Sequence, residues 1–100
     1  LTLAAAGEVG RHGVRVNAVC PGATDTRMIH AIESQIDEAD PAAVGQAYRT
    51  AIPIGRYVTP EEIADVALFL CSDLSAAVTG AYYMADGGRT SVAASITTAR

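Results

Sequence analysis

The spacing of apolar residues divides the chain into short blocks that predict helices and strands in alternation. The Ala-rich start, from Leu1 to about Val9, has the composition and spacing of a helix. From Val14 to Cys20, apolar residues occur on both faces of an extended chain, which is typical of a strand buried in a parallel sheet. A shorter strand is predicted from Ala81 to Ala85.

Two helices are predicted after the first strand. Residues 27–37 have an apolar side and an acidic side, and we expect Glu33 to face water. Asp40 followed by proline predicts a capped start for a second helix over residues 41–51. Residues 52–58 contain a proline and a glycine and are predicted to form a loop.

The third helix of this middle region has the clearest start signal in the chain. Thr59 is placed to cap it, Pro60 suits its first turn, and Glu62 completes a capping box. The helix is predicted to run to about Ser72. Because its apolar residues occur nearly all round, we expect it to be buried.

The order helix, strand, helices, strand predicts an α/β fold with a parallel sheet and crossover helices. Ligands in such folds bind beyond the carboxyl ends of the strands. The first strand ends there in Pro21 and Gly22, and the next four residues read Ala-Thr-Asp-Thr. This corner is therefore the first candidate for a ligand contact.

Composition narrows the classes of partner. The 100 residues carry a net charge of −4 and seven arginines, and they include no lysine. No basic cluster is present, so nucleic acid is not an expected partner. No apolar run is long enough to span a membrane. Cys20 and Cys71 lie in apolar segments, which predicts buried, reduced thiols and a cytoplasmic location.

Three segments, taken in order and at their spacing, identify a resemblance. HGVRVNAVCPGATDTRM, PIGRYVTPEEIADVALFLCSD and VTGAYYMADGG resemble the C-terminal part of the short-chain dehydrogenase/reductase family. The resemblance covers nearly all of residues 1–88. It implies that the chain is the C-terminal portion of a single Rossmann-like domain with a doubly wound parallel sheet. The two predicted strands would be the sixth and seventh of that sheet.

The resemblance also assigns the corner a role. The family's Pro-Gly-x-x-x-Thr segment, which lines the nicotinamide end of NAD or NADP, matches Pro21, Gly22 and Thr26. In the family, main-chain groups near the Thr24 position hold the carboxamide, and we expect the bare backbone of Gly22 to allow a flat ring to come close. The residues expected to bind the cofactor are Pro21, Gly22, Ala23, Thr24 and Thr26.

By the same resemblance, residues 27–51 form a lid on the substrate side of the cofactor. Met28, Ile29 and Ile32 are the residues expected to contact substrate. The whole enzyme would transfer a hydride between the nicotinamide and the carbon of a small-molecule alcohol or ketone. Family members are commonly dimers or tetramers, which implies a homo-oligomer.

No catalytic residue is predicted within these 100 residues. The family's catalytic set includes a Tyr-x-x-x-Lys motif, and this chain has no lysine. The resemblance places that motif upstream of Leu1, so we expect a fragment that is inactive when isolated. The alternative is a non-catalytic chain, either a module that pairs with a partner through its strand edges or a gene remnant.

Several other residues have a structural interpretation that is favoured over a functional one. Asn17 is expected to hydrogen-bond a neighbouring loop, and His30 is expected to be exposed. The acidic run over residues 33–40 is interpreted as a solvated surface rather than a metal site. Asp86-Gly87-Gly88 is expected to form a tight turn, and residues 89–100 a loose tail. Packing or interface roles are expected for Tyr57, Tyr82 and Tyr83.

Overall fold

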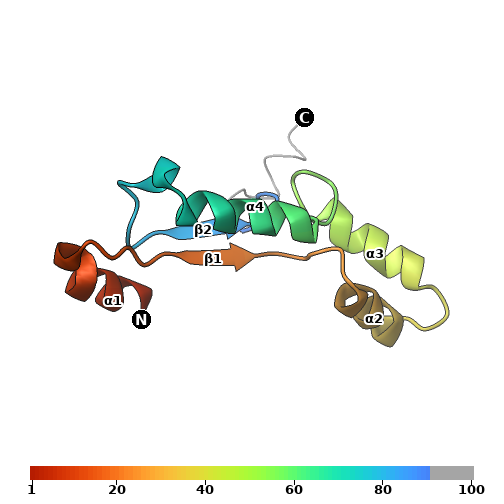
Figure 1. Ribbon diagram of the computed structural model, residues 1–100. Coiled ribbons are helices and arrows are strands. Elements are labelled where there is room, and N and C mark those ends of the chain that lie inside the picture. The colour runs from red at the N-terminus through yellow and green to blue at the C-terminus, as the bar shows by residue number, and fades with distance from the viewer. Residues whose placement is uncertain (91–100) are drawn as a thin grey trace, which may run out of the picture.

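The computed structural model describes residues 1–90, which form an elongated molecule measuring 55 × 33 × 23 Å. A two-stranded sheet lies in the middle, with α1 at one end and the pair α2 and α3 at the other (Figure 1). Helix α4 runs along the sheet. The elements are α1 (Thr2–Val9), η1 (Gly10–His12), β1 (Ala18–Pro21), α2 (Arg27–Ile36), α3 (Pro41–Thr50), α4 (Pro60–Cys71), η2 (Asp73–Ser75) and β2 (Tyr82–Ala85).

The two strands pair in parallel, as predicted. Ala18 lies opposite Tyr82, and Pro21 lies opposite Ala85. Because parallel strands need a crossover, the chain leaves β1, passes through three helices and returns beside it. The corner after Pro21 therefore lies at the carboxyl end of the sheet. Strand β2 ends at the same edge, because Ala85 is its last residue.

The predicted start of the first strand at Val14 is wrong, because regular pairing begins only at Ala18. Before that point one main-chain bond, from the Gly80 amide to the Val16 carbonyl at 2.8 Å, is joined by bonds from a side chain. The amide of Asn17 donates to the carbonyl of Val78 at 3.0 Å, and its oxygen accepts from the Ala81 amide at 3.0 Å. The structural role predicted for Asn17 is confirmed, and these bonds fix the register of the two strands.

The predicted capping box at the start of α4 is confirmed. The Thr59 hydroxyl accepts from the Glu62 amide at 3.1 Å, and the Glu62 carboxylate accepts from the Thr59 amide at 2.8 Å. Arg56 donates two further hydrogen bonds to the same carboxylate, at 2.7 and 2.8 Å. Glu62 therefore holds both the helix start and the loop before it.

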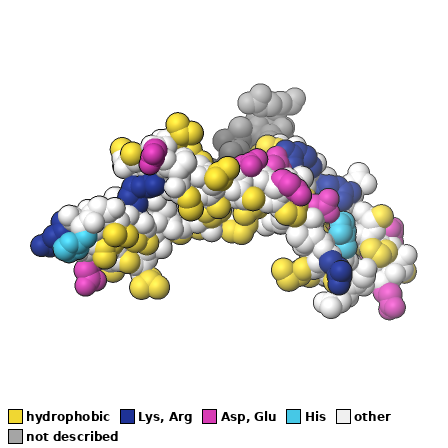
Figure 2. All heavy atoms as spheres, viewed as in Figure 1, with side chains coloured by type: hydrophobic (Ala, Val, Ile, Leu, Met, Phe, Trp, Pro, Cys, Tyr) yellow, Lys and Arg dark blue, Asp and Glu magenta, His cyan; other side chains and the backbone are white. Residues whose placement is uncertain are grey.

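The prediction that α4 is buried all round is wrong. Within the described residues only Leu70 of this helix is buried, whereas Leu68 is 68% exposed and Cys71 is also exposed. A sheet of two strands covers only one side of the helix, so its other apolar residues remain on the surface. Hydrophobic side chains accordingly gather along the middle of the molecule (Figure 2).

Arg15 joins the end of α4 to the segment that leads into β1. Its guanidinium donates to the carbonyls of Leu70 at 2.9 Å, Ser72 at 3.3 Å and Val78 at 3.1 Å, and to the Ser75 hydroxyl at 3.1 Å. The positive charge lies at the helix C-terminus, where it is favoured by the helix dipole. Sequence analysis did not identify this role.

The chain turns sharply after β2, as predicted. Gly87 and Gly88 have φ values of 66° and 88°, a region that favours glycine. The loose tail expected from residue 89 onward lies, over residues 91–100, outside the described residues. In the part of the chain that the structure describes, no helix is long and apolar enough to cross a membrane.

Candidate functional site

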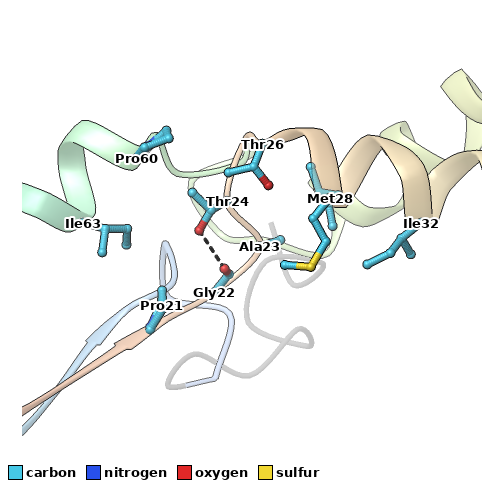
Figure 3. Close-up of a pocket in the computed structure, with 10 residues that line it drawn as sticks. Pro21, Gly22, Ala23, Thr24, Thr26, Met28, Ile32, Pro60 and Ile63 are labelled. Atoms are coloured by element: carbon cyan, nitrogen blue, oxygen red, sulfur yellow. Dashed lines mark hydrogen bonds between the residues drawn. The ribbon is translucent and has the colours of Figure 1, made fainter.

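The corner after β1 forms one wall of a cavity of about 430 Å³ (Figure 3). Every residue that sequence analysis assigned to cofactor or substrate lines this cavity. Two residues of α4, Pro60 and Ile63, complete it and were not predicted. The lining residues are Pro21, Gly22, Ala23, Thr24, Thr26, Met28, Ile29, Ile32, Pro60 and Ile63.

Backbone hydrogen bonds hold the corner on two sides. The Gly22 amide donates to the Ala85 carbonyl at 3.2 Å, which extends the pairing of the two strands. The Asp25 amide donates to the Val58 carbonyl at 2.8 Å, and the Val58 amide donates to the Ala23 carbonyl at 3.1 Å. The corner is therefore a fixed surface rather than a free loop.

Gly22 is required by a contact within the chain. A Cβ built on Gly22 would lie 2.5 Å from the Cβ of Asp86 and 2.8 Å from its Cα, closer than real atoms approach. The resemblance explains this glycine by the approach of a ring from outside the protein. The neighbouring turn demands it independently of any ligand.

Asp86 is only 5% exposed, and its carboxylate holds that turn. It accepts from the amides of Gly88 and Thr90, each at 3.0 Å. Hydrogen bonding from Thr90 above all, with that from Gly88, lowers the pKa of Asp86 below its usual value. The Asp86 carboxylate thus holds the turn, and the backbone and Cβ of Asp86 pack against Gly22 of the corner.

The two threonine hydroxyls of the corner differ in availability. The Thr24 hydroxyl donates to the Gly22 carbonyl at 3.0 Å, so its proton is used within the corner. Thr26 precedes the first residue of α2, yet its hydroxyl makes no capping bond to that helix. Among residues 1–90, the Thr24 amide also has no hydrogen-bond partner. Within residues 1–90, the Thr26 hydroxyl and the Thr24 amide are therefore available to a ligand in the cavity.

The chemistry of the cavity suits a flat, neutral group. None of the ten lining residues is charged, and most of the lining is apolar. Met28 lines the cavity and is 71% exposed. A phosphate would find no cation here, whereas a carboxamide would find donors beside an apolar wall.

A second, smaller hollow of about 250 Å³ shares three residues with the first. Ala23, Ile29 and Ile32 line both cavities, so the corner and α2 separate them. The remaining residues of the second hollow are Tyr48, Ala51, Ile52 and Arg89.

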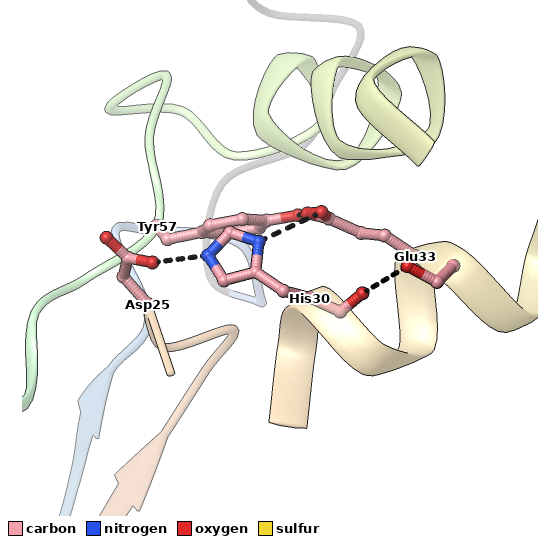
Figure 4. A network of polar contacts seen from close by, with 5 residues as sticks. Asp25, His30, Glu33 and Tyr57 are labelled. Carbon is pink, nitrogen blue, oxygen red and sulfur yellow. Dashed lines mark hydrogen bonds and ion pairs between the residues drawn. The ribbon is translucent and has the colours of Figure 1, made fainter. Parts of the chain in front are cut away.

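A polar network links α2 to the corner and to Tyr57 (Figure 4). One member of this network, Glu33, contradicts the sequence analysis. Glu33 was expected to face water but is 4% exposed. Its carboxylate accepts from the Tyr57 hydroxyl at 3.0 Å and lies 3.2 Å from His30 Nδ1. The other ring nitrogen of His30 lies 2.7 Å from Asp25 Oδ1. His30 is exposed, as predicted, and Tyr57 is packed, as predicted.

Gly45 explains why the glutamate is covered. A Cβ at Gly45 would lie 2.8 Å from Glu33 Oε1 and 3.0 Å from a guanidinium nitrogen of Arg49, so α3 approaches α2 through a residue without a side chain. The Arg49 guanidinium lies 5.6 Å from the centre of the Tyr57 ring. Burial and the bond to Glu33 raise the pKa of Tyr57 to about 12, so the phenol remains a donor.

Comparison with known proteins places this geometry in a family. Residues 1–90 match the family profile described as enoyl-(acyl carrier protein) reductase. The chain is 40% identical over 90 residues to the short-chain dehydrogenase RED2 of Pyricularia oryzae, covering 90% of this chain and 31% of the relative. It is 47% identical over 94 residues to 2-(S)-hydroxypropyl-CoM dehydrogenase 3 of Xanthobacter autotrophicus, covering 92% and 35%.

Solved structures agree with the sequence relatives. A levodione reductase superposes with a TM-score of 0.84 at 35% identity, over 92% of this chain and 36% of that one. An actinorhodin polyketide ketoreductase crystallised with NADPH gives 0.82 at 35% identity, over 91% and 36%. The chain thus spans about a third of the length of its curated relatives. It belongs to the short-chain dehydrogenase/reductase family, and its parallel strands and helices are part of that family's Rossmann fold.

Proposed function

We propose that this chain supplies the nicotinamide end of the cofactor site in an NAD- or NADP-dependent oxidoreductase. The observation that carries the proposal is an uncharged cavity beyond the carboxyl end of β1, lined by all eight residues predicted for cofactor and substrate. Relatives named as dehydrogenases and reductases support it, and one of the similar structures holds NADPH.

The residues present fit the neutral end of such a cofactor. Its ring would lie against the corner at Gly22, and its carboxamide would meet the Thr24 amide and the Thr26 hydroxyl. When bound, the nicotinamide supplies or accepts a hydride. The part of this chain is to fix which face of the ring is presented, because orientation determines where the hydride is delivered.

Helices α2 and α3 would form the substrate lid over residues 27–51. Met28, Ile29 and Ile32 present an apolar wall to the cavity, which suits the carbon skeleton of a small alcohol or ketone. These residues would hold the reacting carbon of the alcohol or ketone beside the ring, and a base would take up or return the hydroxyl proton.

That base is not among these 100 residues, because no lysine is present and no Tyr-x-x-x-Lys motif can occur. We therefore propose that the acid/base residues lie elsewhere in the natural-length protein, which would be a cytoplasmic homo-oligomer. The isolated chain would bind at the corner weakly and would not catalyse the reaction.

The test is a titration of the natural-length protein with NADH and with NADPH, followed by cofactor fluorescence. Thr26→Val removes the free hydroxyl at nearly constant volume and should weaken binding roughly fivefold, the effect of one lost hydrogen bond. Thr2→Val, in α1 at the opposite end of the molecule from the lid helices, is the control and should leave affinity unchanged.

Two results would overturn the proposal. Equal cofactor affinities for the Thr26 and Thr2 variants would show that the corner is not part of the cofactor site. If neither nucleotide bound the unaltered protein, the non-catalytic interaction module would become the better account of the chain.

A further inference from the structure

His30 lies between two carboxylates that belong to different parts of the site. Its Nε2 is 2.7 Å from Asp25 Oδ1, in the corner, and its Nδ1 is 3.2 Å from Glu33 Oε2, within α2 (Figure 4). Asp25 stands between the two threonines of the corner. The ring therefore bridges the predicted cofactor contact and the predicted lid.

The bridge depends on a proton. A neutral imidazole has one N–H group and one acceptor nitrogen, whereas the protonated ring has two N–H groups. Carboxylates only accept, so both contacts are hydrogen bonds only while a proton lies on each side of the ring. Loss of one proton leaves a ring lone pair facing a carboxylate oxygen, and one of the two contacts then becomes repulsive.

Each end of the bridge is fixed to something rigid. Asp25 donates its amide to Val58 at 2.8 Å, so movement of Asp25 moves the corner. Glu33 is buried, is bonded to Tyr57, and lies under Gly45 of α3. The helix that carries Glu33 also carries the apolar wall of the cavity.

The two carboxylates act on the ring in one direction. The carboxylates of Asp25 and Glu33 favour the protonated form. The Tyr57 ring meets the imidazole edge-on, with centroids 6.2 Å apart, and the opposing charge of Arg49 lies on α3, over the Tyr57 ring.

We propose that His30 is a positioning residue, whose doubly protonated ring holds α2 against the corner and so preorganises the cofactor cavity. This inference rests on the proposed function, because it takes the corner to be the cofactor contact. A cavity already held in its bound shape binds more tightly, since less order has to be imposed on binding.

The sign of the pH dependence follows from the contacts. Hydrogen bonding to Asp25, and next to Glu33, raises the pKa of His30 above 6.5. The bridge is complete below pH 6.5 and is lost as the pH rises through the raised value. Cofactor affinity should fall over the same interval.

The first experiment measures hydrogen exchange of the α2 amides in the natural-length protein without cofactor. Unaltered protein and His30→Gln are compared at each pH from 5.5 to 9, so that the intrinsic pH dependence of exchange cancels. His12→Gln, which alters the other histidine of the chain at an exposed position in η1, is the matched control. The unaltered protein should be more protected than His30→Gln at low pH and equal to it at high pH.

The second experiment titrates NADH and NADPH into the same proteins across the same pH range. The unaltered protein and His12→Gln should lose roughly two- to fivefold in affinity as the bridge deprotonates, the scale of an exposed ion pair. His30→Gln should lack that component. Asp25→Asn should lack it too, whereas a simple attraction between the histidine charge and the cofactor phosphates would survive this change.

The outcomes separate the two proposals. Equal α2 protection in His30→Gln and the unaltered protein at every pH overturns the bridge, whatever binds. A pH-dependent difference in protection without any nucleotide binding keeps the bridge and overturns the cofactor site. Binding with parallel pH profiles in all variants keeps the cofactor site and overturns the positioning role.

Discussion

Gly22 and Asp86 touch at the point where the two parallel strands end. The contact is so close that a Cβ on Gly22 would lie 2.5 Å from the Asp86 Cβ. The turn at Asp86, which follows β2, thereby limits the shape of the corner at Gly22, which follows β1. The candidate cofactor cavity is built on this contact.

Gly22→Ala should lower the free energy of unfolding by about 1–3 kcal/mol, the range for overpacking a closely packed contact. The added methyl meets backbone and Cβ atoms, which cannot move aside as a flexible side chain could. Urea unfolding checks the change. Gly7→Ala is the control: nothing lies within 4 Å of its new Cβ, and alanine in a helix should raise stability by about 0.5–1 kcal/mol. Equal effects of the two substitutions would contradict the account.

Tyr57→Phe should cost about 1–3 kcal/mol, because it removes a donor from the buried Glu33 carboxylate and leaves that oxygen unsatisfied. Tyr82→Phe, at a side chain that is 53% exposed, should stay within about 0.5 kcal/mol of the unaltered protein. Thermal unfolding of both variants at pH 7 makes the comparison. If Tyr57→Phe left the free energy of unfolding unchanged, burial of the Glu33 carboxylate would not depend on this hydrogen bond.

Acid should weaken the start of α4 in a defined interval. The bonds from Arg56, and next from Thr59, lower the pKa of Glu62 from 4.5 to about 2. The stabilisation is therefore present above pH 4.5 and is lost as the pH falls toward 2. In Glu62→Gln this component of the pH dependence should be absent, whereas the exposed neighbour Glu61, changed to Gln, should leave it in place. Urea midpoints measured from pH 7 to pH 2.5 would refute the assignment if the two variants behaved alike.

Arg15→Lys should destabilise the protein by about 2 kcal/mol despite keeping the charge. The guanidinium reaches four acceptors at the end of α4 and in the segment that follows it, and a lysine ammonium cannot reproduce that planar set of donors. Arg11→Lys, at an exposed position, should be neutral. Chemical denaturation of the two variants decides between a structural role for Arg15 and simple surface charge.

Features encoded by neighbouring residues could be predicted from the sequence. The capping box at Thr59 depends on residues three apart, and the turn at Gly87 depends on its own two glycines. The residues of the corner also follow one another directly, so their common cavity follows once the parallel fold is known.

Features that depend on distant residues could not be predicted. Glu33 is buried only because Tyr57 donates to it and Gly45 allows α3 to approach. Regular pairing of the first strand begins only at Ala18, and the Asn17 side chain before it bonds to residues more than sixty positions away. The exposure of α4 depends on how many strands the helix packs against. The pattern of apolar residues within the helix does not indicate that number.

The most direct test of the central claim is a crystal structure of the natural-length protein with NADH or NADPH bound. The account predicts that the nicotinamide ring lies in the cavity against Gly22. Its carboxamide should then lie within about 3 Å of the Thr24 amide and the Thr26 hydroxyl. A nicotinamide ring bound elsewhere, with this cavity empty or filled by other side chains, would contradict the account.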